Sequence, residues 1–375
     1  MRHAQYRTAL LTSCILGTLA VPSWAQDAGR VRFPSAGGLG GEIVAQVDNP
    51  GFFASAVVTQ SEVDKLTDSS GNTATRTVSG TFSTPAPVAG AIRTATYSGA
   101  ATVDLKQSQS QLNLVVGYVS QGIYAGGRLS LTANLPYAMR LDRTTNVTGP
   151  TPTLSTLAPA LTTPPLPAGT AAAAQASAQA GFNTGYQNNL KTASSMATGV
   201  EEGLGDVELT AAWSNRTPER RVIVGATLAM PTGKYDAASS LNIGVGNFYT
   251  LRAGAAYAFD PMPNLTVGLR GTLATNTRNK DTQVKRGDFA ALELAAAYRS
   301  SFGVFGPHVV MVRQFRDDDG NPQGANRYSI TNAGLFYAMR LPGPDVGINL
   351  SYTTTLDSKN AMSGSIYQVR ISKAF

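Results

Sequence analysis

Apolar and polar residues alternate along most of the chain from Gly203 onward, in segments of roughly 10 to 14 residues. In the first of these segments, Leu209 and Trp213 share one face, and Glu208 and Thr210 share the other. A period of two places successive side chains on opposite faces of a β-strand. Because segments of this length suit tilted strands that cross a bilayer, the pattern predicts transmembrane β-strands.

Nine such segments lie from Gly203 onward and three lie upstream, so the chain has twelve. The predicted strands cover residues 51–63, 111–120, 126–139, 203–215, 221–230, 247–259, 265–276, 289–300, 302–315, 327–340, 345–356 and 367–375. Bacterial outer-membrane barrels have an even number of antiparallel strands. We therefore expect an all-β fold, a closed antiparallel transmembrane β-barrel of about 12 strands.

The connections between the predicted strands alternate in length. Those after even-numbered strands are short, as in Asn215 to Glu219, whereas those after odd-numbered strands are long. Outer-membrane barrels have short periplasmic turns and longer extracellular loops, so these lengths also assign the two sides. The longest connection, residues 143–202, is a low-complexity Pro/Thr/Ala stretch followed by an Ala- and Gln-rich stretch that predicts a helix of about two or three turns. We expect it to be an extracellular loop or to fold into the barrel mouth.

Aromatic residues recur on the apolar face near the periplasmic end of each strand that runs toward the periplasm. Transmembrane barrels carry such aromatics where their lipid-facing surface meets the interface. The alternative, a soluble lipocalin-like barrel or sandwich, buries its apolar face in a core and has no reason to ring one edge with Tyr and Trp. The predicted lipid-interface girdle consists of Tyr118, Trp213, Tyr257, Tyr298, Tyr337 and Phe375.

Charged and amide side chains occupy the opposite face of the predicted strands. A charge on the lipid face at mid-bilayer costs about 2–4 kcal/mol, so these side chains are expected to point into the barrel. They either line a narrow aqueous pore with paired charges or tie the interior shut. The lumen-lining candidates are Arg128, Asn134, Asp206, Glu208, Arg252, Arg270, Glu293, Arg299 and Arg370.

The first 25 residues have the features of a secretory signal peptide. A short basic start precedes a mostly apolar stretch, residues 9–21, and small residues stand before the expected cleavage point after Ala25. The mature chain is then residues 26–375, and this export predicts a bacterial outer-membrane location. A lipoprotein processing site at Cys14 is the alternative, but the apolar run continues beyond that cysteine.

The net charge of the mature chain narrows the choice of partners. The chain has 30 Lys and Arg and 23 Asp and Glu, and the signal peptide contains two of the basic residues, so the mature balance is 28 − 23 = +5. Such a mild excess suits anionic lipid head groups or lipopolysaccharide better than nucleic acid. Four basic residues of one predicted outer loop are either solvated or bind lipopolysaccharide phosphates: Arg278, Lys280, Lys285 and Arg286.

Candidate catalytic residues are few, and we predict that the protein is not an enzyme and holds no cofactor or metal. His308 is followed two positions later by Val310, so the His and Ser pairing of an outer-membrane phospholipase is absent. Omptin-type proteolysis needs a His beside clustered aspartates at the outer rim, and a calcium site needs clustered carboxylates. Asp317 to Asp319 lie beyond the strand of His308, but this stretch reads first as a hairpin turn.

Several stretches resemble a family of outer-membrane proteins named for the meta-pathway of phenol degradation. They are "NPGFFASAVVTQSEVDKLTDSSGN", "GIYAGGRLSLTANLPY", "GLGDVEL" and "AMPTGKYDAASSLNIGVGNFYTLRAGAAYAF". The resemblance covers most of the mature chain outside residues 143–202. It implies an outer-membrane barrel that passes small, hydrophobic, often aromatic compounds, and it carries over no ligand residues.

The last residues, "YQVRISKAF", place Tyr367, Val369 and Ile371 on one face and end on Phe375. Such a strand resembles the signal that the barrel-assembly machinery recognises, although Lys373 stands where an apolar or aromatic residue is usual. We expect an outer-membrane channel for passive passage of small, hydrophobic or aromatic solutes. The alternative is a closed structural or surface-interaction barrel that acts through its long extracellular loop.

Overall fold

The computed structural model describes residues 32, 49–85, 92–158, 168–321, 326–341, 343 and 345–375. The predicted signal peptide lies outside these residues. Twelve strands form a closed antiparallel barrel: β1 (Gly51–Leu66), β3 (Ile92–Val119), β4 (Arg128–Thr148), β6 (Glu208–Arg216), β7 (Arg220–Ala229), β8 (Thr250–Met262), β9 (Leu265–Asn276), β10 (Phe289–Ser300), β11 (Gly303–Gln314), β12 (Ser329–Leu341), β13 (Val346–Lys359) and β14 (Met362–Ala374).

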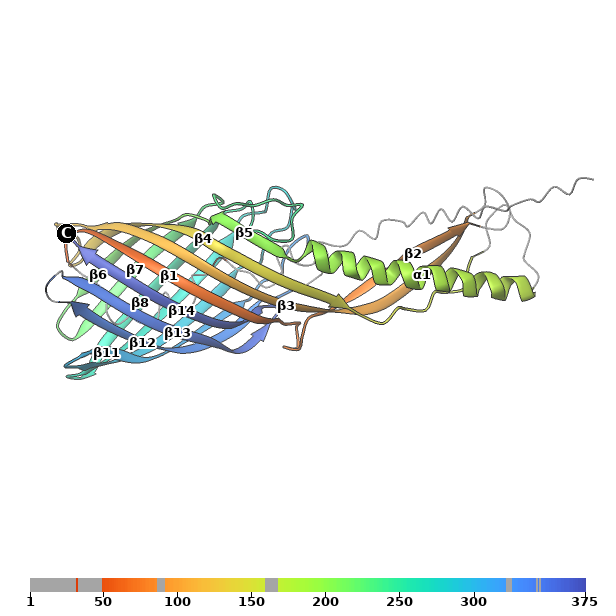
Figure 1. The fold of residues 1–375 in the computed structure, drawn as a ribbon. Coiled ribbons are helices and arrows are strands. Elements are labelled where there is room, and N and C mark those ends of the chain that lie inside the picture. The colour runs from red at the N-terminus through yellow and green to blue at the C-terminus, as the bar shows by residue number, and fades with distance from the viewer. Residues whose placement is uncertain are drawn as a thin grey trace, which may run out of the picture. The chain divides into compact units, whose positions relative to one another are not determined.

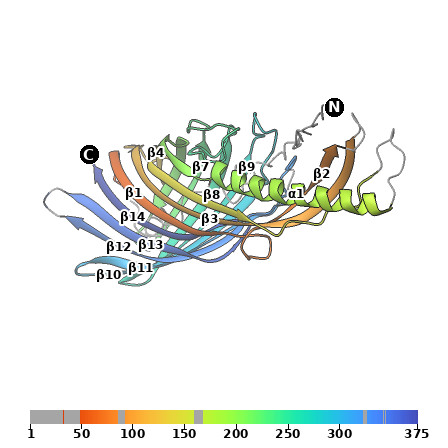
Figure 2. The same ribbon diagram turned by 45° about the vertical axis from the view of Figure 1, so that its right-hand side comes forward.

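Pairing of the last barrel strand with the first closes the sheet. β14 runs antiparallel to β1 with Phe53 opposite Ala374, and the backbone N–H of Phe375 donates to the carbonyl of Phe52 over 2.8 Å. β3 pairs with both β1 and β4, so the ring is complete. Figure 1 shows the tilted strands of the barrel, with the C-terminus at one end, and Figure 2 shows the same strands from a second direction.

All twelve predicted strands are confirmed, with one change at residues 203–215. That segment is two strands, β5 (Gly199–Leu204) and β6, separated by three residues. β5 pairs with the outer part of β4, while β6 pairs with the part of β4 nearer the periplasmic turn. Asp206 therefore lies in the break between strands, where its side chain is free to reach other loops.

Residues 75–102 and 147–193 form most of a second compact unit. The connection after the first predicted strand, one of the long ones, contains strand β2 (Thr75–Pro85), which pairs with the start of β3. Helix α1 (Ala168–Met196) has 29 residues, far more than the predicted two or three turns. Ala and Gln, which are strong helix formers, favour its first half, and the packing of Phe182 and Tyr186 supports the second half, which contains Gly181 and Gly185.

An aromatic cluster holds the second unit together. Phe182 and Tyr186 of α1 pack against Phe82 of β2 and Tyr97 of β3, with ring centroids 4.7–6.2 Å apart. Tyr186 is 1% exposed. Such contacts between offset or tilted rings stabilise beyond the area that they bury. Residues 143–202 therefore contribute a packed helix rather than only a low-complexity loop.

Across the described ranges, no helical stretch combines the length and the hydropathy of a membrane span.

Candidate functional site: the barrel interior

The outward face of the barrel carries an apolar band. Leu114, Leu131, Leu269, Leu335 and Val369 are all exposed on it. The structure places the six predicted girdle residues on this outward face, near the end with the short turns: Tyr118, Trp213, Tyr257, Tyr298, Tyr337 and Phe375. Exposed apolar side chains on this scale suit a lipid-facing surface. Their role as an interfacial girdle stays a prediction.

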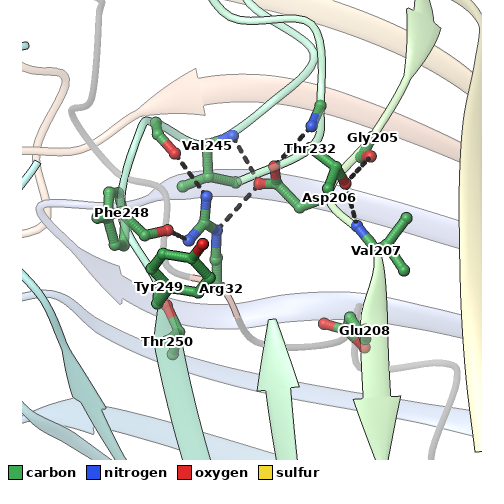
Figure 3. A network of polar contacts seen from close by, with 12 residues as sticks. Arg32, Gly205, Asp206, Val207, Glu208, Thr232, Val245, Phe248, Tyr249 and Thr250 are labelled. Atoms are coloured by element: carbon green, nitrogen blue, oxygen red, sulfur yellow. Dashed lines mark hydrogen bonds and ion pairs between the residues drawn. The ribbon is translucent and has the colours of Figure 1, made fainter. Parts of the chain in front are cut away.

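Arg32 is held inside the barrel by three acceptors, as Figure 3 shows. Its Nε lies 2.9 Å from Oδ2 of Asp206, and its terminal nitrogens donate to the backbone carbonyls of Gly246, over 2.6 Å, and Phe248. Its guanidinium also lies 4.2 Å from the centre of the Phe248 ring. The Arg32 side chain is 2% exposed and that of Asp206 is 9% exposed, so the pair is desolvated. A charged pair in such a place persists only when its remaining hydrogen-bonding groups are also satisfied.

Asp206 has the partners that this burial requires. Besides Arg32, its carboxylate accepts the backbone N–H of Gly233 over 3.1 Å and that of Val245 over 3.0 Å. These donors belong to the long connection between β7 and β8. Asp206 thus joins three parts of the chain: the segment before β1, the break before β6, and this extracellular connection.

A second ion pair continues the network toward the barrel wall. Nη2 of Arg252, on β8, lies 2.7 Å from Oε1 of Glu208, on β6. Nη1 of Arg252 donates to the backbone carbonyl of Arg32 over 2.9 Å. The Arg32–Asp206 and Arg252–Glu208 ion pairs are thus joined through the backbone carbonyl of Arg32, and they form one network with equal numbers of positive and negative charges.

A third ion pair lies on neighbouring strands. Arg270 of β9 and Glu293 of β10 stand opposite each other in the register. They form two parallel hydrogen bonds of 2.8 and 2.7 Å, the fork-to-fork arrangement in which Arg binds carboxylate most strongly. Glu293 is almost completely buried, whereas Arg270 keeps part of its surface accessible.

The other predicted lumen residues have different surroundings. Arg128 donates to the carbonyls of Ser120 and Gln121, so it closes a periplasmic turn rather than lining the middle of the barrel. Arg299 is exposed near the end of β10, beside the short turn that leads to β11. Asn134 and Arg370 are half-buried on the inward face. That these nine residues line a solute path remains a prediction.

A line of amides on β3 was not among the predicted lumen residues. Gln107, Gln109, Gln111 and Asn113 alternate with Ser108 and other outward residues. Gln107 accepts two hydrogen bonds, of 2.9 and 2.7 Å, from the buried guanidinium of Arg143. The signal was present as "QSQSQLN", but a Gln/Ser alternation has no apolar face and so gives no hydrophobic periodicity.

The inward face of β10 to β12 is largely apolar instead. Phe289, Val310 and Ile330 belong to one buried cluster there, and Phe336 belongs to another. His308 lies among them, is 2% exposed, and makes a 2.9 Å hydrogen bond through Nε2 to the hydroxyl of Thr353. The barrel interior therefore combines paired charges, neutral amides and apolar side chains.

The acidic loop after β11 does not present free carboxylates. Asp317 receives a 2.6 Å hydrogen bond from Arg327, which holds the pKa of that carboxyl below its usual value. Asp318 accepts from Gly287 N–H and from the side chains of Gln314 and Asn321, and Asp319 pairs with Arg278. Within the described ranges, His, Cys, Asp and Glu side chains form no group of three that would hold a metal ion.

A closed antiparallel barrel with an apolar outer face and polar side chains inside defines an outer-membrane β-barrel. Comparison with solved structures agrees. The crystal structure of the COG4313 outer membrane channel from Pseudomonas putida F1 superposes with a TM-score of 0.60 at 15% identity, over 87% of this chain and 96% of that chain. This likeness shows a shared fold.

Two other solved barrels match less closely. The β domain of the Bordetella autotransporter BrkA has a TM-score of 0.45 at 10% identity, over 87% of this chain and 100% of that chain. The CymD monoaromatic hydrocarbon channel has a TM-score of 0.38 at 12% identity, over 90% of this chain and 93% of that chain. No curated protein sequence matches the chain.

The sequence profile of the family described as "Putative MetA-pathway of phenol degradation" matches residues 92–371. This match covers most of the chain, and the protein belongs to that family. The resemblance noted from the sequence is therefore confirmed.

Proposed function

We propose that this protein is an outer-membrane channel for the passive passage of small, hydrophobic or aromatic solutes. Family membership supports the solute class, since the family is described by a pathway of phenol degradation. The structural likeness to an outer membrane channel supports the mode of action. A small uncharged solute needs no change of protein conformation driven by an energy source, so a fixed interior suffices for its diffusion.

The composition of the barrel interior is the observation that carries this proposal. Each of the acidic side chains Asp206, Glu208 and Glu293 is paired with an arginine, so the negative charge of these three inward side chains is compensated. Pairing weakens the field that would otherwise select strongly for ions. Neutral amides and apolar clusters make up much of the remaining inward face. An interior of this kind suits solutes with an apolar ring and few polar atoms.

The Arg32 network limits the size of the solute. Arg32 precedes β1 in the chain, and its side chain lies within the barrel. It therefore occupies part of the cross-section that is open in a general porin. The channel is therefore narrow, and passage of large hydrophilic solutes is not part of its function.

Two further partners follow from the surface. Exposed Lys280, together with the loop that contains Arg278 and Lys285, supports contact with lipopolysaccharide phosphates. The pairing of Arg278 with Asp319 weakens the contribution of that arginine. The alternation along β14 up to Phe375 supports recognition by the barrel-assembly machinery during insertion. No catalytic role is assigned to any residue.

The packed helix of the second unit favours a second function, that of a closed barrel which acts in surface interaction through residues 143–202. The packing of its Phe182 and Tyr186 with Tyr97 of β3 supports a defined surface on this segment. Uptake of phenol and toluene into liposomes that contain the purified protein separates the two functions. The channel predicts faster uptake than in protein-free liposomes, whereas the surface-interaction barrel predicts equal uptake.

A further inference from the structure

Four side-chain amides form one hydrogen-bonded line on the inner face of β3 and β4. Gln109 donates to Gln111 over 2.8 Å, and Gln111 donates to Asn113 over 2.8 Å. Asn113 in turn donates to Asn134 on the neighbouring strand over 3.0 Å. Because each amide donates to the next, the line is ordered head to tail; we call it the amide track.

The amide track has unused hydrogen-bonding capacity. A side-chain amide offers two N–H donors and a carbonyl oxygen with two lone pairs. The line uses one donor of each donating residue and one lone pair of each accepting residue. All four side chains are half-buried, so part of each faces the barrel interior. The ion pairs differ in this respect, because the carboxylates and guanidiniums there satisfy one another.

The amide track leads from the outer interface into the depth of the membrane. Ser108 and Ser110, which face outward beside it, are polar, whereas the next outward residues, Leu112 and Leu114, are apolar. Gln109 and Gln111 therefore lie at the outer edge of the apolar band, and Asn113 lies within it. From Gln109 to Asn113 the track extends about 13 Å along the strand.

We propose that the amide track is a binding path for uncharged solutes that carry a hydroxyl or carbonyl group. This inference rests on the proposed channel function. It states which of the transported solutes bind inside the channel during passage. A hydroxyl both donates and accepts, so it can form a hydrogen bond with any amide of the track. Because the amides are chemically similar, each binds the hydroxyl with similar strength. Conduction favours such weak binding at several sites over one deep site. A hydrocarbon of the same size makes none of these bonds.

Ionic current in a planar bilayer tests this path with phenol and toluene as probes, because their rings match and only phenol has a hydroxyl. The measured quantity is the concentration of each probe that halves the single-channel current. The test variant is the double substitution Gln111→Met and Asn113→Leu, which keeps volume and removes the amides. The matched control is Ser110→Ala, which changes the adjacent residue on the outer face, where it bonds to Gln60.

We expect phenol to halve the wild-type current at a lower concentration than toluene does. In the double variant, the half-blocking concentration of phenol rises about tenfold, as the loss of two modest hydrogen bonds implies, and that of toluene is unchanged. Ser110→Ala behaves as wild type.

An equal shift for both probes, or no shift for phenol, overturns the amide track while leaving the proposed channel function intact. A wild-type protein that conducts no current overturns the proposed function itself. If the double variant does not assemble, Gln111→Met alone gives the same comparison, with a shift of about threefold.

Discussion

The guanidinium of Arg32 lies 2.9 Å from the carboxylate of Asp206, although 174 positions separate the two residues. The contact places a residue that precedes every barrel strand inside the closed barrel. It also joins that residue to the loop between β7 and β8 through the backbone donors of Gly233 and Val245. The contact therefore couples Arg32 to an extracellular loop.

Replacing Arg32 is expected to widen the path. Arg32→Ala removes a buried side chain and leaves Asp206 without its counter-charge, so single-channel conductance should rise. Breaking one side of a buried ion pair costs about 3–5 kcal/mol, so the barrel should also unfold at lower temperature. Conductance in a planar bilayer and the temperature at which the protein loses its folded gel mobility measure the two effects.

Arg216→Ala is the matched control for that variant. Arg216 is exposed at the end of β6, at a periplasmic turn, and its removal should change neither quantity. If Arg32→Ala has the conductance of the wild type, the Arg32 side chain does not narrow the solute path.

The pair of Arg270 and Glu293 is expected to set the ion selectivity of the current that passes through the channel. Glu293→Gln leaves the buried positive charge of Arg270 uncompensated, so anions should be favoured and stability should fall by about 3–5 kcal/mol. The double variant Arg270→Met and Glu293→Met removes both charges and should recover much of the stability. Reversal potentials in a salt gradient and thermal unfolding distinguish the variants. Equal reversal potentials in wild type and Glu293→Gln would show that this pair does not face the ion path.

Gly334 allows His308 to reach Thr353 across the strand between them. The three residues stand in one row of the register. A Cβ on Gly334 would overlap the carbonyl oxygen of Tyr352 and come within 2.8 Å of the His308 ring. Gly334→Ala should therefore destabilise the barrel by about 1–3 kcal/mol.

Gly271 provides the comparison, because a Cβ there would have nothing within 4 Å. Gly271→Ala should leave the unfolding temperature unchanged or slightly raised. Equal unfolding temperatures for the two variants would contradict the packing of His308 against Gly334.

Tyr186 is expected to make the stability of the second unit sensitive to alkaline pH. Burial raises the pKa of Tyr186 above its usual value, because its ionised form is poorly solvated. A raised folded pKa stabilises the fold below the unfolded pKa of about 10, and this contribution is lost as the pH rises through the folded value. The helical signal in circular dichroism should therefore fall above about pH 10.

Tyr186→Phe tests this assignment. Among the described residues, the Tyr186 hydroxyl has no hydrogen-bond partner, so its removal should cost little or even stabilise the unit. The alkaline loss of helix should then shift to higher pH. A loss at the same pH in both proteins would assign the transition to another group.

The strands were predictable from the sequence because a strand in lipid must keep one face apolar. Leu209 and Trp213 show this pattern clearly, and the closure of β14 on β1 followed from the even number of strands. The pairing of Arg270 with Glu293 was predictable only in part. Their inward direction followed from the cost of charge in lipid, whereas their register depends on turn geometry that the sequence does not display.

The site around Arg32 had no signal in the sequence. Arg32 precedes the periodic part of the chain, and its partners Gly246 and Phe248 bind through backbone carbonyls, which every residue has. Asp206 was predicted to face inward, but from within a strand rather than from a break. The length of α1 was underestimated because glycines at positions 169, 181 and 185 have low helix propensity, which the packing of Phe182 and Tyr186 overrides.

Single-channel recording of the purified, folded protein in a planar bilayer distinguishes an open channel from a closed barrel. An open channel with a narrow interior should give small, discrete current steps that phenol reduces at lower concentration than toluene. A sample that shows the heat-dependent gel mobility of a folded barrel and yet passes no current would show that the barrel is closed.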